Sequence, residues 1–178
     1  MKILCDRHQL LEAFAFVGGI PPPKTPKPIL QNVLCRAEDN SLTLFATDGE
    51  MSAKVTVDSV KVSTPGTVLL PARETAELLR ELGEPTLTLT SEDFRCTIES
   101  GSGSYVLLGE NPAEFPPEPS LDEQLTIDVA VSPFVDMVRR TSFAAAREET
   151  RYAINGLLLD HSEGQLRQIG RASCRERV

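Results

Sequence analysis

The sequence predicts an α+β protein in which two helices pack on a mostly antiparallel sheet, with the domain duplicated and the second copy truncated. The first observation behind this prediction is a repeated element, in which an asparagine precedes an apolar run, a polar turn and a second apolar run. The element covers residues 32–44 and recurs at residues 155–167, so the period of roughly 120 residues is too long for a solenoid repeat. The second observation is that the apolar runs are short and separated by turn signals, which is typical of an antiparallel sheet.

The first copy is expected to begin with a strand at residues 3–6 and a helix over Arg7–Val17, with Asp6 as the N-cap of the helix. Apolar side chains recur at helical spacing in this segment and predict one buried stripe. The stripe comprises Leu10, Leu11, Phe14 and Val17. Five prolines between residues 20 and 28 exclude a helix there and predict a stiff, extended connector.

Three runs rich in Val, Leu and Thr predict strands after this connector. They cover residues 29–36, 42–47 and 51–58. A strand over residues 67–70 then leads into a helix over residues 72–82, and further strands are expected over residues 86–90, 94–99 and 104–108. The buried face of this second helix comprises Ala76, Leu79 and Leu82. A complete copy should therefore hold two helices that cover one sheet of roughly eight strands.

The second copy is expected to follow an extended linker, since residues 111–119 contain four prolines. A strand is expected over residues 125–131, a helix that starts at Ser132-Pro133, and a strand over residues 151–160. The buried face of this helix comprises Phe134, Val135, Met137 and Val138. We therefore divide the chain into a first domain at residues 1–118 and a truncated second domain at residues 119–167.

Residues 168–178 are interpreted as a non-native, adapter-derived tail. They can be encoded by DNA that contains AGATCGGAAGAGC, the start of a common sequencing adapter, and the repeat pattern breaks where they begin. We expect this tail to pack poorly. The whole chain has a net charge of −8, and the tail holds three Arg and one Glu, so the remaining residues carry −10.

The composition of the chain argues against some classes of protein. An acidic chain argues against a protein that binds nucleic acid over a generally basic surface, although a local basic face is compatible with it. No apolar run approaches the length of a membrane span, so we expect a cytoplasmic protein that does not enter a membrane. Cys5, Cys35 and Cys96 occur singly in strand-like runs, which predicts buried free thiols in a reducing compartment.

The patterns that could carry catalysis or bind a metal each have a simpler structural explanation. His8 and His161 have no partner at ligand spacing, and Gly101 lies in a turn between two strands. Asp48 belongs to an Asp-Gly turn, and the neighbouring carboxylates at residues 148–149 diverge in direction. We therefore expect no catalytic residue, no metal site and no cofactor.

Basic residues on the helices give a different signal. Arg73 and Arg80 are seven residues apart, so they share one face of the helix over residues 72–82. Further basic residues occur at Lys24, Lys27, Arg139, Arg140 and Arg147. From spacing alone, a DNA-contact surface and an ordinary mixed-charge surface both stay open, because Glu residues interleave with the arginines.

Six short segments follow one another in an order that is specific to one protein family. They are residues 1–3, 28–34, 46–51, 70–73, 112–116 and 150–156. Over about residues 1–167 the chain resembles the N-terminal part of bacterial sliding clamps, the beta subunit of the replicative DNA polymerase III. The resemblance implies a DNA-clamp unit that is repeated three times per chain. It also implies a head-to-tail homodimer that forms a ring around duplex DNA and tethers the replicative polymerase as a non-catalytic processivity factor.

The resemblance also implies roles for individual residues and identifies partners. Lys24 and Arg73 match basic positions near DNA, Arg80 is added from the same helix as Arg73, and Arg147 from its neighbourhood. A partner-peptide pocket would include Arg151 and Ile154. A dimer interface would include Ser104, Tyr105, Val106, Leu107 and Leu108. The expected partners are duplex DNA, a second copy of the full-length chain, the replicative polymerase and clamp loader subunits.

Two other classes of protein remain open on the sequence. One is a non-catalytic protein-interaction domain that uses the exposed sheet edge at residues 104–108. The other is a hydrolase or transferase whose site carries no recognisable motif. A second Thr-Asp-Gly turn after Arg167, followed by a third unit, would favour the clamp over both.

Overall fold

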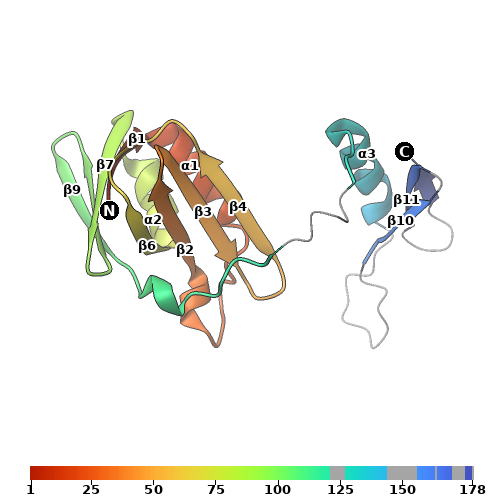
Figure 1. Ribbon diagram of the computed structural model, residues 1–178, viewed down its shortest axis with the longest axis horizontal. Coiled ribbons are helices and arrows are strands. Elements are labelled where there is room, and N and C mark those ends of the chain that lie inside the picture. The colour runs from red at the N-terminus through yellow and green to blue at the C-terminus, as the bar shows by residue number, and fades with distance from the viewer. Residues whose placement is uncertain (121–126, 144–155, 163, 170–174, 178) are drawn as a thin grey trace. The chain divides into compact units, whose positions relative to one another are not determined.

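The structure is a computed structural model that describes residues 1–120, 127–143, 156–162, 164–169 and 175–177 (Figure 1). The chain forms two compact units, Met1–Ser120 and Leu121–Val178. The first unit contains two α-helices, two short 3-10 helices and strands β1 to β9, and the described part of the second contains one α-helix and three strands.

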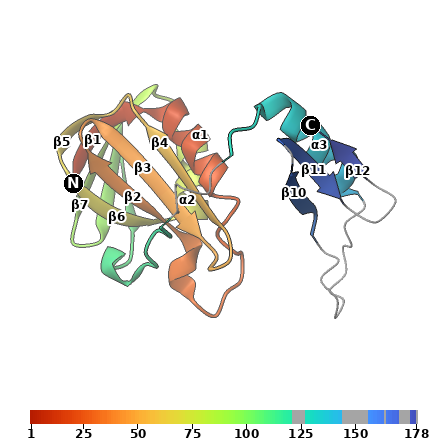
Figure 2. The same ribbon diagram turned by 45° about the vertical axis from the view of Figure 1, so that its right-hand side comes forward.

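The first unit has a five-stranded sheet in the order β5-β1-β7-β8-β9, in which every pair is antiparallel. Its strands are β1 (Lys2–Asp6), β5 (Lys61–Thr64), β7 (Thr86–Glu92), β8 (Arg95–Ser100) and β9 (Gly103–Leu108). β9 lies at one edge of this sheet and β5 at the other. Figure 2 shows β5, β1 and β7 together on one side of this unit.

A second sheet of four antiparallel strands has the order β4-β3-β2-β6. Its strands are β2 (Asn32–Glu38), β3 (Ser41–Thr47), β4 (Ser52–Val57) and β6 (Gly66–Pro71). The β2–β3 hairpin turns at Asp39 and Asn40, with φ of 45° and 59°, a conformation that Asp and Asn tolerate better than most residues. The expectation of a single sheet is therefore wrong in this respect, because the strands divide between two sheets.

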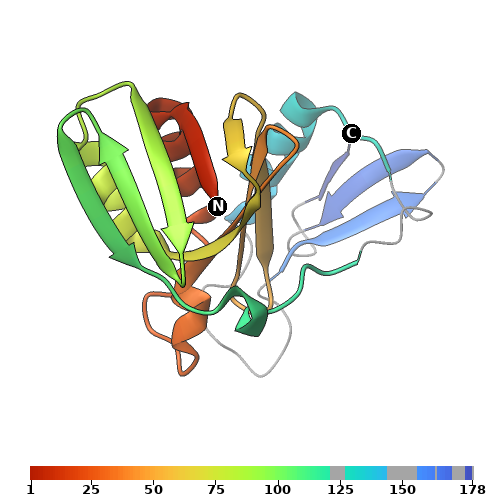
Figure 3. The ribbon, with the colours of Figure 1, turned by 60° about the vertical axis from the view of Figure 1, so that its left-hand side comes forward.

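Helices α1 (Arg7–Val17) and α2 (Ala72–Glu81) contact each other, and the red and yellow-green ribbons lie side by side in Figure 3. Asp6 caps α1 as expected, since its Oδ1 accepts a hydrogen bond of 2.9 Å from the Gln9 amide. Phe14 and Leu79 are fully buried in one core that also contains residues from strands of both sheets. Leu11 is only half-buried, because Leu10 and Ala13 occupy the buried face of α1 beside Phe14.

Two strand starts and one additional strand are among the differences between the first unit and the sequence prediction. Residues 29–31 belong to the 3-10 helix η1 (Pro28–Gln31), so the strand expected from residue 29 begins at Asn32. β8 begins at Arg95 rather than residue 94, because Asp93 and Phe94 form the preceding turn with φ of 43° and 64°. The short strand β5 was not expected; it lies at the sheet edge and pairs with β1.

The segment expected as an extended linker at residues 111–119 is partly folded. It contains the 3-10 helix η2 (Pro112–Glu114), whose first amide is capped by the side chain of Asn111. Phe115 follows this turn and is 6% exposed. The prolines predicted the absence of a regular helix or strand correctly, but they did not reveal that an aromatic side chain anchors the segment.

In the second unit, α3 (Val131–Ser142) starts after the N-cap Ala130, so Ser132 lies inside the helix and does not cap it. Residues 127–130 precede α3 without strand structure, which contradicts that part of the expected strand at residues 125–131. Met137 is buried as expected, whereas Val135 is 37% exposed. The reason for this difference is that Met137 and Thr141, one turn apart, form the buried stripe.

The same unit has an antiparallel sheet of β10 (Leu158–Ser162), β11 (Gln165–Ile169) and β12 (Arg175–Arg177). Residues 151–155 lie outside the described residues, so only the later part of the strand expected at residues 151–160 can be compared with β10. Gln168 is 2% exposed and β12 pairs with β11, so these parts of the tail pack better than we expected. The proposal that residues 168–178 are adapter-derived stays a prediction.

Candidate nucleic-acid interface

Helix α2 separates a buried face from a charged one. Ala72, Thr75, Ala76 and Leu79 are buried, and the Thr75 hydroxyl donates a hydrogen bond of 2.6 Å to the Pro71 carbonyl oxygen. The opposite face carries exposed charged side chains, namely Arg73, Glu74, Glu77 and Arg80. Because 3.6 residues complete a turn, this spacing keeps both arginines on the exposed side of the same helix.

The two arginines have different surroundings. The Arg73 side chain is 84% exposed, and its Nε donates a hydrogen bond of 2.9 Å to Glu77 Oε1. That hydrogen bond raises the pKa of Arg73 above its ordinary value, so the guanidinium stays charged. Arg80 is also exposed and makes no ion pair with any residue that the structure describes. Arg80 is therefore available to an external anion, whereas Arg73 is shared with Glu77.

The proline-rich connector lies beside this helix. Gln31 Nε2 donates a hydrogen bond of 3.0 Å to the Pro23 carbonyl oxygen and so pins the connector to η1. A hollow of about 560 Å³ lies between the end of α1, the connector and α2. Arg73 and Arg80 line it from one side and Pro21 to Pro23 from the other. Lys24 is exposed and follows Pro23 directly.

This surface suits weak contact with phosphates. Exposed guanidinium and ammonium groups bind phosphate oxygens without reading base sequence, and solvent and salt screen each contact. The glutamates on α2 lower the local positive potential further. The arrangement therefore favours several weak contacts with phosphates over one tight anion site.

Arg147, Arg151 and Ile154 fall on residues that the structure does not describe, so their roles stay predictions. The predicted interface residues, in contrast, form a defined feature. β9 pairs only with β8 among the described strands, and its other edge is open.

The open edge of β9 carries large apolar side chains. Tyr105 is 42% exposed, Val106 48% and Leu108 72%. An unpaired edge with exposed apolar side chains is a template for pairing with another strand. Phe94, which no sequence motif singled out, is 50% exposed in the adjoining β7–β8 turn. Its position could not be read from the sequence, because a bulky residue with positive φ is uncommon in a turn.

The described residues show no arrangement that suggests metal or nucleophilic chemistry. Asp48 Oδ1 accepts hydrogen bonds from the amides of Met51 at 2.7 Å and Glu50 at 2.8 Å, and these hold its pKa below the ordinary value. No group of three His, Cys, Asp or Glu side chains that could bind a metal occurs in the part of the chain that the structure describes. Cys5, Cys35 and Cys96 are buried free thiols, as the sequence predicted.

No helix in the described ranges is long and apolar enough to cross a membrane.

Burial raises the pKa of Cys5 to about 12 and that of Cys96 to about 11, so both thiols stay protonated near neutral pH.

Comparisons with known proteins point to one protein family. The family model for the DNA polymerase III beta subunit, N-terminal domain, matches residues 1–122. The beta sliding clamp of Chlamydia muridarum is 34% identical over 171 residues, which cover 96% of this chain and 46% of that protein. The beta sliding clamp of Streptomyces coelicolor is 31% identical over 160 residues, which cover 90% of this chain and 42% of that protein.

Solved structures agree on the fold. The DNA polymerase III subunit beta from Pseudomonas aeruginosa matches with a TM-score of 0.88 at 28% identity, covering 94% of this chain and 46% of that one. The DNA polymerase sliding clamp from Bacillus subtilis matches with a TM-score of 0.90 at 23% identity over the same shares, which shows likeness of fold. The chain thus spans about half the length of the relatives that it matches.

Proposed function

We propose, from the premise that this chain belongs to the family of the DNA polymerase III beta subunit, that its full-length parent is a sliding clamp. The parent encircles duplex DNA as a ring-shaped homodimer and tethers the replicative polymerase, which makes it a processivity factor of DNA replication. It performs no catalysis. Residues 1–118 are its N-terminal clamp domain and residues 119–167 the start of its central domain.

The observation that carries this proposal is the exposed face of α2. Arg73 and Arg80 lie on it, beside the connector that holds Lys24, while the opposite face of the helix packs into the core. In a ring with helices on the inside, this face contacts the DNA backbone. A closed ring needs no strong grip on phosphates, and a few screened contacts let it slide. The net charge of −8 keeps the rest of the surface from binding DNA non-specifically.

The open edge of β9 supports the homodimer. In a head-to-tail dimer, residues 104–108 meet a different surface of the partner, and two such heterologous contacts close the ring. The apolar side chains of Tyr105, Val106 and Leu108 would then be covered. Arg147 would add a DNA contact, and Arg151 and Ile154 would contribute to a pocket for peptides of the polymerase and of clamp loader subunits. We place the protein in the cytoplasm, where the free thiols stay reduced.

The decisive experiment uses the full-length parent, loaded by its clamp loader onto circular and linear duplexes of equal length. The ring should remain on circular DNA and slide off linear DNA. Equal retention on both templates, or a parent that stays monomeric at high concentration, would contradict the proposal.

A set of matched variants tests the DNA-facing helix in the same assay. Arg73→Glu, Arg80→Glu and Lys24→Glu should weaken loading without unfolding the ring. Arg36→Glu is the control, because Arg36 is also exposed but lies on the sheet strand β2. A loss of loading in the Arg36 variant equal to that of the helix variants would sink the assignment of α2 to the DNA side.

The second candidate function is a non-catalytic interaction domain that pairs another protein's strand with β9. The exposed apolar edge favours it. It predicts a partner complex that Val106→Asp disrupts, together with equal retention on circular and linear DNA, so the template comparison separates the two functions.

A further inference from the structure

One part of the outer face of the four-stranded sheet is apolar where a solvent-facing sheet would be polar. Alternation along β3 and β6 points Leu44 and Leu70 into the main core, and so directs Phe45 and Leu69 to the opposite face. Both outward side chains are nonetheless buried, at 4% and 0% exposed. Something must therefore cover this face of the sheet, because the exposure of Phe and Leu to water is unfavourable.

Phe115 provides the cover. It forms a second small core with Phe45 and Leu69, against which Ile29 and Leu34 also pack. The Phe45 and Phe115 rings meet edge to face, with centroids 6.0 Å apart and planes at 90°. Phe115, which follows the edge strand β9 of the five-stranded sheet, is thus packed against the four-stranded sheet.

The segment before Phe115 is fixed to both sheets. The Gly109 amide donates a hydrogen bond of 2.7 Å to the Phe94 carbonyl oxygen, and Glu110 forms a bridge with Leu69. A Cβ on residue 109 would collide with the Leu69 carbonyl oxygen, so only glycine fits this crossing. Asn32 Nδ2 then donates a hydrogen bond of 3.1 Å to Glu110 Oε1.

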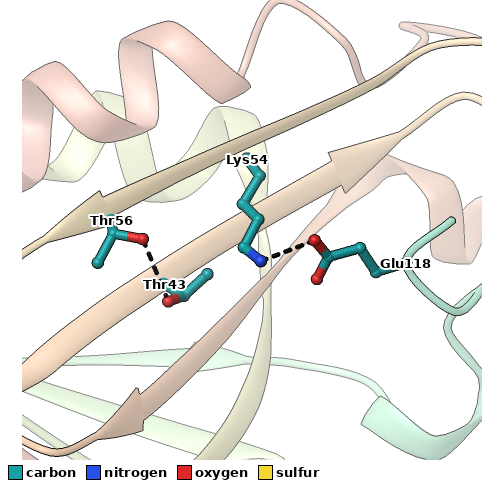
Figure 4. A network of polar contacts seen from close by, with 4 residues as sticks. All are labelled: Thr43, Lys54, Thr56 and Glu118. Carbon is teal, nitrogen blue, oxygen red and sulfur yellow. Dashed lines mark hydrogen bonds and ion pairs between the residues drawn. The ribbon is translucent and has the colours of Figure 1, made fainter. Parts of the chain in front are cut away.

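The far end of the segment is fixed at the opposite edge of the same sheet. Lys54 on β4 donates a hydrogen bond of 2.7 Å to Glu118 Oε1 (Figure 4). The segment therefore starts beside β6 and ends beside β4, the two edges of the four-stranded sheet. We name residues 109–118 the strap.

We propose that the strap positions the edge strand β9, with Phe115 as its anchor, and so holds the subunit interface in the geometry needed for ring closure. β9 pairs with one strand only, and Gly109 follows its last residue directly. An anchor fixed a few residues further along restricts how far that strand can move away from β8. The interface half of this inference rests on the proposed function, whereas the positioning of β9 does not.

The first test measures amide hydrogen exchange in this 178-residue chain. Phe115→Ala should raise exchange of the Gly109 amide and of the β8–β9 ladder by at least about tenfold, through local opening. Phe14→Ala is the matched control, since it removes the same ring from the main core. It should accelerate only those amides that exchange through global unfolding. Equal acceleration of β9 in both variants, or none with Phe115→Ala, overturns the proposal.

A second set of less disruptive variants distinguishes loosening of the strap from misfolding of the whole chain. Phe115→Leu keeps an apolar anchor and should restore most of the protection of β9. Lys54→Glu and Glu118→Lys should each loosen the strap, and the double reversal should recover protection because the ion pair is restored. Failure of both the leucine variant and the double reversal to recover β9 counts against the strap.

The second test measures the dimer dissociation constant of the full-length parent. Phe115→Ala should raise it by about tenfold or more although Phe115 is outside the β9 edge, and Phe115→Leu should bring it back. If Phe115→Ala loosens β9 but leaves the dimer dissociation constant unchanged, the part of the inference that concerns the subunit interface is wrong. A wild-type parent that never dimerises refutes the proposed function instead, and the exchange data still decide whether the strap positions β9.

Discussion

Arg7 Nη1 donates a hydrogen bond of 3.1 Å to the carbonyl oxygen of Leu79, so the first residue of α1 caps the last turn of α2. The last carbonyls of a helix lack intrahelical donors, and a cation near them also complements the helix dipole. The Arg7 amide in addition donates a hydrogen bond of 2.8 Å to the Pro85 carbonyl oxygen beyond α2. Arg7 therefore fixes α2, and with it the arginines of the candidate DNA surface.

The Arg7 cap can be tested by equilibrium unfolding. Arg7→Ala should lower the free energy of unfolding by about 1–3 kcal/mol, because it removes a charged donor and leaves the Leu79 carbonyl oxygen unpaired. His8→Ala is the control, since His8 is exposed and its contact with Glu12 lies on the surface. Its effect should stay within about 0.5 kcal/mol. A urea midpoint for Arg7→Ala equal to that of His8→Ala would contradict the role of the cap.

The buried face of α1 predicts that alanine substitution of two phenylalanines changes the unfolding free energy by very different amounts. Phe14 is fully buried, whereas Phe16, two residues later, is 63% exposed. Phe14→Ala should cost about 3–5 kcal/mol of unfolding free energy through the cavity that it leaves. Phe16→Ala should cost less than about 0.5 kcal/mol. Urea unfolding of both variants measures the difference, and a loss below about 1 kcal/mol for Phe14→Ala would show that the face is misassigned.

Glu77 is expected to weaken DNA contact, because it occupies the guanidinium of Arg73. Glu77→Gln should raise the affinity of this chain for a short duplex by about two- to fivefold and make its salt dependence steeper. Glu99→Gln makes the same change at an exposed position of β8 and should leave the affinity unaltered. Fluorescence anisotropy over a sodium chloride series measures both quantities. Identical behaviour of the two variants would argue that α2 does not face DNA.

The buried thiols predict a loss of stability at alkaline pH. Burial raises the pKa of Cys5 from 9.0 to about 12 and that of Cys96 from 9.0 to about 11, and it raises the pKa of Cys35 as well. Between pH 9 and 11 the unfolded chain releases thiol protons that the folded chain retains. The free energy of unfolding should therefore fall, by up to about 1.4 kcal/mol per pH unit for each thiol, whereas below pH 9 the thiols contribute no slope.

Urea unfolding between pH 8 and 11 measures this slope. Lysine and tyrosine side chains also titrate in this range, so the informative quantity is the difference between the wild-type chain and Cys35→Ala. The variant should show the shallower slope above pH 9. Parallel curves would mean that Cys35 ionises equally in the folded and unfolded states.

Local signals predicted much of the first unit. Asp6 and the apolar stripe of α1 located that helix at Arg7–Val17, and the polar turn between the two apolar runs of residues 32–44 located the β2–β3 hairpin. Both depend on neighbouring residues only, which is why they can be read from sequence. The family resemblance, rather than spacing, identified Lys24, Arg73 and residues 104–108 as site residues, and their roles stay predictions.

Tertiary contacts account for the features that the sequence did not reveal. β5 is short and depends on β1 for its pairing, so four residues gave no periodic signal. Pro28 and a buried Leu30 favour a 3-10 turn where the apolar run suggested a strand. Phe115 lies in a segment that reads as a linker, and the partner that buries it, Phe45, is far away in sequence.

The covered outer face of the four-stranded sheet also determines where this protein can be shortened. A version cut directly after Leu108 would retain every strand of the first unit, yet Phe45 and Leu69 would face water on the outer face of the sheet. Exposed apolar surface of this kind promotes aggregation of the shortened chain. The smallest piece that avoids this exposure should therefore extend at least through Glu118, ten residues past β9, the last strand of the first unit.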